Sequence, residues 1–107
     1  MLYTELKVKD TEYKLRLNTR AIIVLEKKLG CNPLNIFAGI NQNKIPTVTD
    51  MVTILHAALQ PYHSNITIEK AYDIFDEWLD DGNIASEFIT VILELYKDAG
   101  LIKKEKN

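Results

Sequence analysis

The stretch NTRAIIVLEKKLGCNPLNIF, residues 18–37, contains the plainest folding signals of this 107-residue chain. An Asn-Thr pair at its start offers an oxygen that can cap a helix, and apolar residues then recur at helical spacing as far as Leu29. Gly30 can adopt the left-handed conformation that ends a helix. Asn32 and Pro33 favour a new start, because proline suits the first helical position. The stretch therefore predicts two consecutive helices joined by a tight break.

Two short segments before this stretch show the alternation of apolar and polar residues that is typical of β-strands. Residues 2–9 alternate loosely, residues 13–17 alternate strictly, and the polar residues 10–12 between them predict a turn. An isolated two-stranded hairpin is only marginally stable in water. We therefore expect an N-terminal β-hairpin whose apolar face packs on the helices.

Three further amphipathic helices are predicted after the stretch. One begins at the cap Thr47 and ends before Pro61, the next begins at the cap Thr67, and the last covers residues 84–99. The second of these should bury an apolar stripe, widened by neighbouring apolar residues. The stripe residues are Ile68, Tyr72, Phe75 and Leu79, and the residues that widen it are Ala71, Ile74 and Trp78.

These patterns predict an α+β fold, mostly α, in which an N-terminal β-hairpin packs on a bundle of about four to five helices. We expect one globular domain over residues 1–100, followed by a flexible charged tail over residues 101–107. Six residues at the centres of the helical stripes should be buried. They are Leu25, Leu29, Leu55, Leu59, Phe75 and Leu95.

Composition narrows the function classes. The formal net charge is −2, with 13 basic and 15 acidic residues, whereas nucleic-acid-binding domains usually carry a basic surface. The single cysteine, Cys31, excludes an internal disulfide and fits a reducing cytoplasm. The N-terminus does not resemble a signal peptide, and no apolar stretch approaches the ~20 residues of a membrane-spanning helix. We expect neither a nucleic-acid nor a membrane partner.

No group of residues in the sequence predicts catalysis or a cofactor. The two histidines, His56 and His63, lie in a predicted helix and a predicted loop, and Cys31 follows a helix-ending glycine. A zinc site needs three or four ligands at suitable spacing, which this sequence does not offer. The four glycines are scattered, so there is no phosphate-binding loop. We therefore predict that the protein is not an enzyme and binds no metal or other cofactor.

Four acidic residues share one face of the helix that is predicted to begin at the cap Thr67, at positions i, i+3, i+4 and i+7. They are Asp73, Asp76, Glu77 and Asp80. Like charges at these spacings destabilise a helix by about 0.2–0.5 kcal/mol per pair, and the helix dipole disfavours anions near the C-terminus. The face could be a solvated surface, a surface for a basic partner or a neighbouring subunit, or, least favoured, a divalent-cation site. We predict a partner-binding face.

The helices also carry more apolar residues than one stripe each requires. The surplus residues are Ile23, Val24, Ile74 and Ile89. Such residues usually complete a core, but a cluster that stays exposed marks a binding patch. Both interpretations remain open from the sequence.

Taken in order, these segments resemble the tail assembly chaperones of long-tailed, siphovirus-type phages and prophages of Gram-positive bacteria. The likeness lies in YKLRLNTRAIIVLEKKLGCNPLNIF, PTVTDMVTILHAALQPY, ITIEKAYDIFDEWLDDG and FITVILELYKDAGLI, and so covers nearly the whole chain. Each piece alone is common among helical proteins, and the order and spacing of the four pieces make the likeness specific.

The resemblance implies a chaperone that binds the phage tape-measure protein in the host bacterial cytoplasm and is absent from the mature virion. Tail-tube subunits are a further implied partner, and a homo-oligomer is compatible with the likeness. The resemblance assigns no individual binding residue.

A small helical DNA-binding regulator is the alternative function. It would need a basic recognition helix, for which residues 18–30 are the one candidate. We expect the block Ile22-Ile23-Val24-Leu25 in that helix to be buried, which argues against this alternative.

Overall fold

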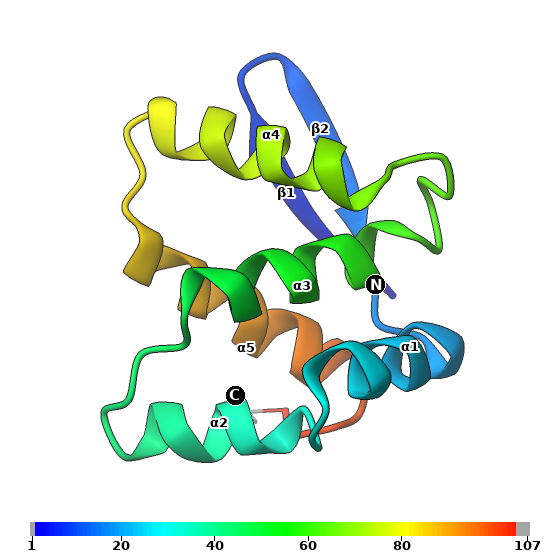
Figure 1. Ribbon diagram of the computed structural model, residues 1–107, viewed down its shortest axis with the longest axis vertical. Helices are drawn as coiled ribbons and strands as arrows, with labels where there is room; N and C mark the ends of the chain where they lie inside the picture. The colour runs from blue at the N-terminus through cyan, green and yellow to red at the C-terminus, as the bar shows by residue number, and fades with distance from the viewer. Residues whose placement is uncertain (1, 105–107) are drawn as a thin grey trace.

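The computed structural model describes residues 2–104 and contains an N-terminal hairpin followed by five α-helices, as the sequence predicted (Figure 1). Met1 and residues 105–107 lie outside the described part of the chain. The hairpin strands are β1 (Thr4–Val8) and β2 (Thr11–Leu15). The helices are α1 (Thr19–Leu29), α2 (Leu34–Asn41), α3 (Val48–Leu59), α4 (Ile68–Asp80) and α5 (Phe88–Asp98), with a 3₁₀ turn, η1 (Ala85–Glu87), before α5.

The turn of the hairpin is shorter than the alternation of apolar and polar residues suggested. Val8 pairs with Thr11, so the turn consists of Lys9 and Asp10 and not of residues 10–12. Lys9 adopts the left-handed conformation, with φ of 54°, which suits a two-residue hairpin loop. Its amide donates a hydrogen bond of 2.7 Å to Oδ2 of Asp81, at the end of α4. The turn is therefore stabilised by a contact that is remote in sequence.

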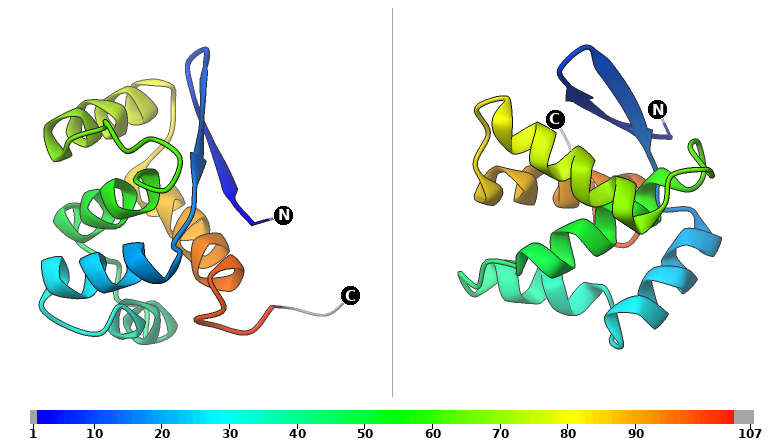
Figure 2. Two further views of the ribbon diagram at one scale, coloured as in Figure 1. Left: turned by 90° about the vertical axis from the view of Figure 1, so that its right-hand side faces the viewer. Right: turned by 45° about the horizontal axis from the view of Figure 1, so that its top comes forward.

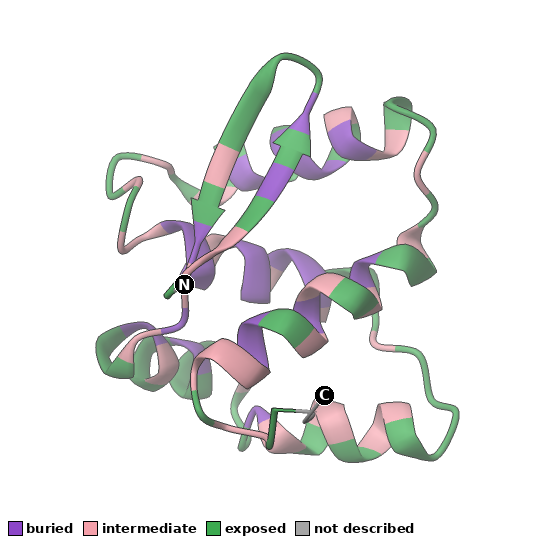
Figure 3. Ribbon diagram, turned by 180° about the vertical axis from the view of Figure 1, so that it is seen from behind, coloured by how far each residue is buried: buried purple, intermediate pink, exposed green. Residues whose placement is uncertain are grey.

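The outer edge of β2 is also hydrogen-bonded to the helical part of the protein. The Lys14 amide donates to Nε2 of His63 at 3.1 Å, and the Arg16 amide donates to the Ala58 carbonyl at 2.9 Å. Towards the end of β1, the buried residues Leu6 and Val8 alternate with exposed ones (Figure 3). The hairpin thus lies on one side of the helices and closes the core there (Figure 2).

The predicted helix caps are confirmed. Oδ1 of Asn18 accepts a hydrogen bond from the third residue of α1, and the hydroxyls of Thr47 and Thr67 accept the corresponding bonds in α3 and α4. Gly30 and Gly100 end α1 and α5 in the left-handed conformation. Local sequence signals therefore set most of the helix ends.

The core surrounds α3, which runs through the middle of the molecule (Figure 1). Seven of its 12 residues are buried. Five of the six residues expected in the core are buried, namely Leu25, Leu55, Leu59, Phe75 and Leu95. Leu29, in the last turn of α1, is only half-buried, because the helix end reaches the margin of the core.

The buried face of α4 is offset from the predicted stripe. Tyr72 is 48% exposed, and Ile68 and Leu79 are only partly buried. The residues expected to widen the stripe form its centre instead, together with Phe75. The buried residues are Ala71, Ile74, Phe75 and Trp78. The offset has a physical cause, since it places the rings of Phe75 and Trp78 5.5 and 5.6 Å from the ring of Phe88.

The last helix begins later than expected, at Phe88. Gly82, with φ of 97°, turns the chain after α4, and the Asn83 side-chain amide donates to the Trp78 carbonyl at 2.8 Å. The Ile84 amide then donates to Oε1 of Glu87 at 2.7 Å. These contacts fix a 3₁₀ turn, so that residues 84–87 do not continue as α-helix.

Packing continues past the predicted domain boundary at residue 100. After Gly100 the Leu101 amide donates to the Tyr96 carbonyl at 3.0 Å, and the Gly100 amide donates to the Lys97 carbonyl at 3.1 Å, the two bonds of a Schellman motif. Leu101 and Ile102 are partly buried against the core. Of the predicted tail, Lys103 and Lys104 are exposed, and residues 105–107 lie outside the described residues.

Candidate protein-binding surfaces

Helix α2 is the least covered α-helix in the described part of the chain. Its apolar residues are Leu34, Ile36, Phe37 and Ile40, and none of them is fully buried. The other four α-helices each bury two or more side chains. The contrast is visible in Figure 3, where α2 shows no buried residue. An apolar helix face is therefore left half-exposed at the surface.

One buried hydrogen bond attaches the start of α2 to the core. The Tyr96 hydroxyl, on α5, donates to the carbonyl of Pro33 at 2.9 Å. Both residues are buried. Burial raises the pKa of Tyr96, so the hydroxyl keeps its proton and remains a donor at any physiological pH.

An apolar groove of about 650 Å³ lies between α2 and the end of α5. The chain segment after α5 forms its other wall and passes close to α2 (Figure 2). The groove is lined by Leu34, Phe37, Leu93, Lys97, Leu101, Ile102 and Lys103. Its charged lining residues are both lysines, and residues 31–43, which include all of α2, contain no charged side chain.

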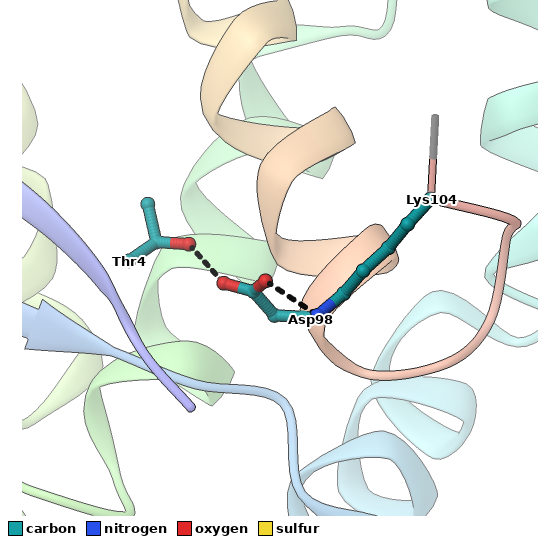
Figure 4. Close-up of polar contacts among 3 residues, drawn as sticks. All are labelled: Thr4, Asp98 and Lys104. Carbon is teal, nitrogen blue, oxygen red and sulfur yellow. Dashed lines mark hydrogen bonds and ion pairs between the residues drawn. The ribbon is translucent and has the colours of Figure 1, made fainter. Parts of the chain in front are cut away.

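Asp98 holds the segment that forms this wall (Figure 4). Its Oδ2 accepts a hydrogen bond from the Thr4 hydroxyl of β1 at 3.1 Å. Its Oδ1 lies 3.8 Å from Nζ of Lys104, which is an ion pair. One carboxylate thus connects the hairpin, α5 and the chain that follows α5.

The predicted acidic face lies on the outer side of α4, away from the core. Asp73, Asp76 and Asp80 are exposed and Glu77 is half-buried. None of the four forms a hydrogen bond or ion pair with another side chain of residues 2–104, whereas the neighbouring Asp81 accepts the Lys9 amide. The structure therefore gives these four carboxylates no internal role, and their contact with a partner stays a prediction.

The surplus apolar residues divide between core and surface. Ile74 is buried and Ile89 is half-buried, but Ile23 and Val24 on α1 are 46% and 38% exposed. The expectation that the whole Ile22–Leu25 block is buried is therefore wrong. Because α1 packs through Ala21 and Leu25, with Ile22 partly buried beside them, Ile23 and Val24 point outward.

A second hollow, of about 790 Å³, lies between the start of α1 and the end of α3. Arg20, Val24, His56 and Gln60 are among its lining residues. It is more polar than the groove beside α2. Burial lowers the pKa of His56; a hydrogen bond to the Ile66 backbone opposes this shift, and the nearby Lys28 charge adds to it.

The lowered pKa of His56 predicts a loss of stability in acid. The folded protein resists protonation of His56, while the unfolded chain takes up the proton near its ordinary pKa of 6.5. Stability should therefore fall as the pH drops below 6.5 and stop falling, for this group, once the pH is below the folded pKa. A His56→Gln variant should show a shallower decline in urea titrations between about pH 7.5 and 5. An unchanged decline would show that His56 does not contribute.

Neither remaining candidate for chemistry lies in a reactive arrangement. Cys31 is exposed, and His63 packs edge-on against Tyr13, at 5.5 Å between ring centres, while it accepts the Lys14 amide. Among residues 2–104 no three His, Cys, Asp or Glu side chains are grouped so that they could hold a metal ion. Over the same residues no helix is both long enough and apolar enough to cross a membrane.

The sequence did not single out the groove beside α2. None of the residues that line this groove is predicted from the sequence to belong to a binding site. One available signal was the absence of charge over residues 31–43, which is unusual for the surface helix of a small domain. A short, uncharged helix beside a long polar loop indicates incomplete burial.

Comparison with known proteins gives a family without an assigned role. A family model described as "Family of unknown function (DUF6096)" matches residues 3–107. No curated protein and no solved structure matches the chain. Because the match extends over nearly the whole chain, the protein belongs to the DUF6096 family.

Proposed function

We propose that this protein is a tail assembly chaperone of a long-tailed phage or prophage, which binds the tape-measure protein and keeps it soluble during tail assembly. The proposal joins the resemblance of the sequence to one observation, the half-exposed apolar face of α2 with its adjoining groove. Action in the host cytoplasm, absence from the mature virion and contact with tail-tube subunits are parts of the same proposal.

The physical reasoning concerns the state of a tape-measure protein before assembly. A long, helical, apolar chain exposes surface that aggregates until other subunits enclose it. An amphipathic helix of such a chain can be covered by laying its apolar face into a groove. The groove beside α2 offers apolar side chains from two helices and from the segment after α5. Binding would bury surfaces on both proteins that are otherwise exposed to water.

Co-expression with the tape-measure protein of the same phage or prophage tests the proposal. The expected result is that this long product is soluble and co-purifies with the chain, and is insoluble without it. Phe37→Asp should reduce the co-purified amount at least about tenfold, because a charge in the groove opposes apolar contact. Ile45→Asp is the matched control, since Ile45 is 63% exposed and does not line the groove.

A thermal melt of both variants must accompany this experiment, because Phe37 is partly buried against the core. Similar melting temperatures for the two variants would assign a lost interaction to the groove and not to unfolding. If the long product is soluble alone, or if wild-type protein does not bind it, the proposed function is wrong.

The acidic face of α4 provides a further prediction. Reversing the charge of Asp76 and Glu77 with lysine should leave the melting temperature nearly unchanged, since neither carboxylate has a partner within residues 2–104. Binding of the tape-measure protein or of a sister subunit should weaken several-fold if the face contacts a basic surface. Unchanged binding in a pull-down with the double variant would identify a solvated face.

A further inference from the structure

We infer that the free edge of β1 pairs with the β1 edge of a second copy of this chain, so that two hairpins form one four-stranded antiparallel sheet. The left view of Figure 2 shows β1 at the outer margin of the molecule, where a second chain can reach it. The inference goes beyond the proposed function, because it names a partner other than the tape-measure protein.

The two edges of the hairpin differ in how their backbone groups are used. Val8 and Thr11 pair across the two-residue turn, and the backbone groups of successive residues point to opposite edges of a strand. The amides and carbonyls of Glu5 and Lys7 therefore point outward from β1. Within residues 2–104 no hydrogen bond reaches these four groups, whereas the outward amide of Lys14 on β2 is hydrogen-bonded.

Two contacts hold β1 in place near its ends. The Thr4 hydroxyl donates to Asp98 on α5 at 3.1 Å, and the Lys9 amide donates to Asp81, after α4, at 2.7 Å. The strand between these contacts is held extended before any partner arrives, which lowers the entropic cost of pairing. An ordered edge with unpaired backbone groups is a template for another strand.

The side chains along this edge are complementary to a second copy of the same strand. Glu5 and Lys7 are exposed on the face away from the core, because Leu6 and Val8 are buried on the other face. An antiparallel pair centred on Leu6 places each Glu5 directly opposite the partner's Lys7, and opposite charges so placed stabilise a sheet. Each of the two equivalent pairs exchanges two backbone bonds, which satisfies all four free groups of each edge.

Other arrangements of the same two strands bring like charges together. An antiparallel pair centred on Glu5 places this carboxylate opposite its own copy, and a pair centred on Lys7 does the same for the ammonium group. Parallel strands in register also place identical residues side by side. Like charges directly opposite one another destabilise a sheet, so the alternation of charge selects one register. An extended apolar segment of another protein would bring no charge to this edge.

The surroundings of Glu5 favour a further positive charge at this point. A side-chain hydrogen bond with Glu12, the charge of Glu12 and partial desolvation raise the pKa of Glu5, and the charge of Lys14 opposes the rise. Two carboxylates thus lie together on the outer face of the hairpin. The partner's Lys7 would add an opposite charge beside them.

The purified full chain tests the inference in sedimentation velocity experiments over about 5–1,000 μM, since a contact between short strands buries less than the ~1,200 Å² of a standard stable interface. The wild-type protein should show a concentration-dependent monomer–dimer equilibrium. Lys7→Glu and Glu5→Lys should each weaken the dimer about tenfold, because each places like charges opposite one another across the edge.

An equimolar mixture of the two variants gives the decisive comparison. One edge is then wholly acidic and the other wholly basic, so the mixture should dimerise at least as tightly as the wild-type protein. Such recovery requires both variants to be folded, which separates a lost contact from unfolding. Lys27→Glu is the matched control, since Lys27 is exposed in the last turn of α1, and it should dimerise like the wild-type protein.

Amide hydrogen exchange locates the contact. Exchange at Glu5 and Lys7 should slow as the protein concentration rises, because these amides become bonded in the dimer. The Lys14 amide should not respond, because it is already bonded to His63 of its own chain.

Several outcomes would overturn the inference. They are a wild-type chain that remains monomeric at about 1,000 μM, a dimer that both charge reversals leave intact, and a mixture that does not recover. A dimer that dissociates in Phe37→Ala and not in Lys7→Glu would assign the contact to the groove beside α2. Lost tape-measure binding in Lys7→Glu without any dimer would assign the edge to the client. Because sedimentation needs no tape-measure protein, failure of the dimer and failure of the proposed function are distinguishable.

Discussion

A Leu55→Ala variant is expected to lose about 2–5 kcal/mol of unfolding free energy. Leu55 lies in the middle of α3 and is fully buried, and α3 is the helix around which the core is built. Truncation removes its apolar contacts and leaves a cavity that the surrounding helices can fill only in part. Because small domains have total stabilities of about 5–15 kcal/mol, the variant should be substantially unfolded under mild denaturing conditions.

Urea denaturation monitored by circular dichroism measures this loss directly. Val48→Ala is the matched control, since Val48 lies on the same helix but is 54% exposed. The control should change the unfolding free energy by no more than about 0.5 kcal/mol. A loss below about 0.5 kcal/mol in Leu55→Ala would contradict the central position of α3 in the core.

A Tyr96→Phe variant is expected to lose about 0.5–1.5 kcal/mol and to release α2 from the core. The substitution removes only the hydroxyl that donates to the Pro33 carbonyl at 2.9 Å. That carbonyl would keep its second donor, the Ile36 amide at 3.1 Å, so the expected loss is that of one buried hydrogen bond. Because α2 has no buried side chain of its own, we expect α2 to unfold locally before the rest of the protein.

Amide hydrogen exchange should show whether the loss of stability is confined to α2. We expect faster exchange over α2 in Tyr96→Phe, and little change in α3. Co-purification of the tape-measure protein, the proposed client, should weaken in the same variant, because α2 forms one wall of the groove. Tyr62→Phe is the control, since Tyr62 is exposed and its ring packs against Tyr3 and Lys14, on the hairpin side of the protein and not beside α2. Uniform exchange across the whole protein in Tyr96→Phe would show that α2 does not move independently.

Local rules predicted the helix boundaries and failed where long-range packing decided the outcome. A capping oxygen or a left-handed glycine acts within a few residues, so Asn18, Thr47 and Gly30 could be interpreted from the sequence. The offset of the buried face of α4 could not be predicted in this way, because α4 carries two large aromatic side chains, Tyr72 and Trp78, on different faces. Trp78 is the buried one, and it packs against Phe88, which belongs to a different element. Likewise, Tyr96 gave no sign in the sequence of its bond to Pro33, 63 residues away.

The groove beside α2 was even less predictable from the sequence than the packing of α4. Its walls come from α2, α5 and the segment after α5, which meet only in the folded protein. The acidic face of α4 could be predicted, since all four carboxylates lie on one helix and their spacing alone places them together. Composite surfaces require the tertiary structure, whereas single-helix surfaces do not.

The hydrogen bonds along the hairpin margins bear on the proposed chaperone function, in which the protein would meet aggregation-prone chains. Open strand edges template the addition of further strands, which is a common route into fibrous aggregates. The imidazole of His63 occupies the Lys14 amide of β2, and the Ala58 carbonyl occupies the Arg16 amide just after the strand, so an incoming strand could not use either amide. At the end of β1, Asp81 occupies the Lys9 amide, and the charges of Glu5 and Lys7 lie along the remainder. A hairpin protected in this way can sit close to unassembled apolar chains without seeding their conversion into β-structure.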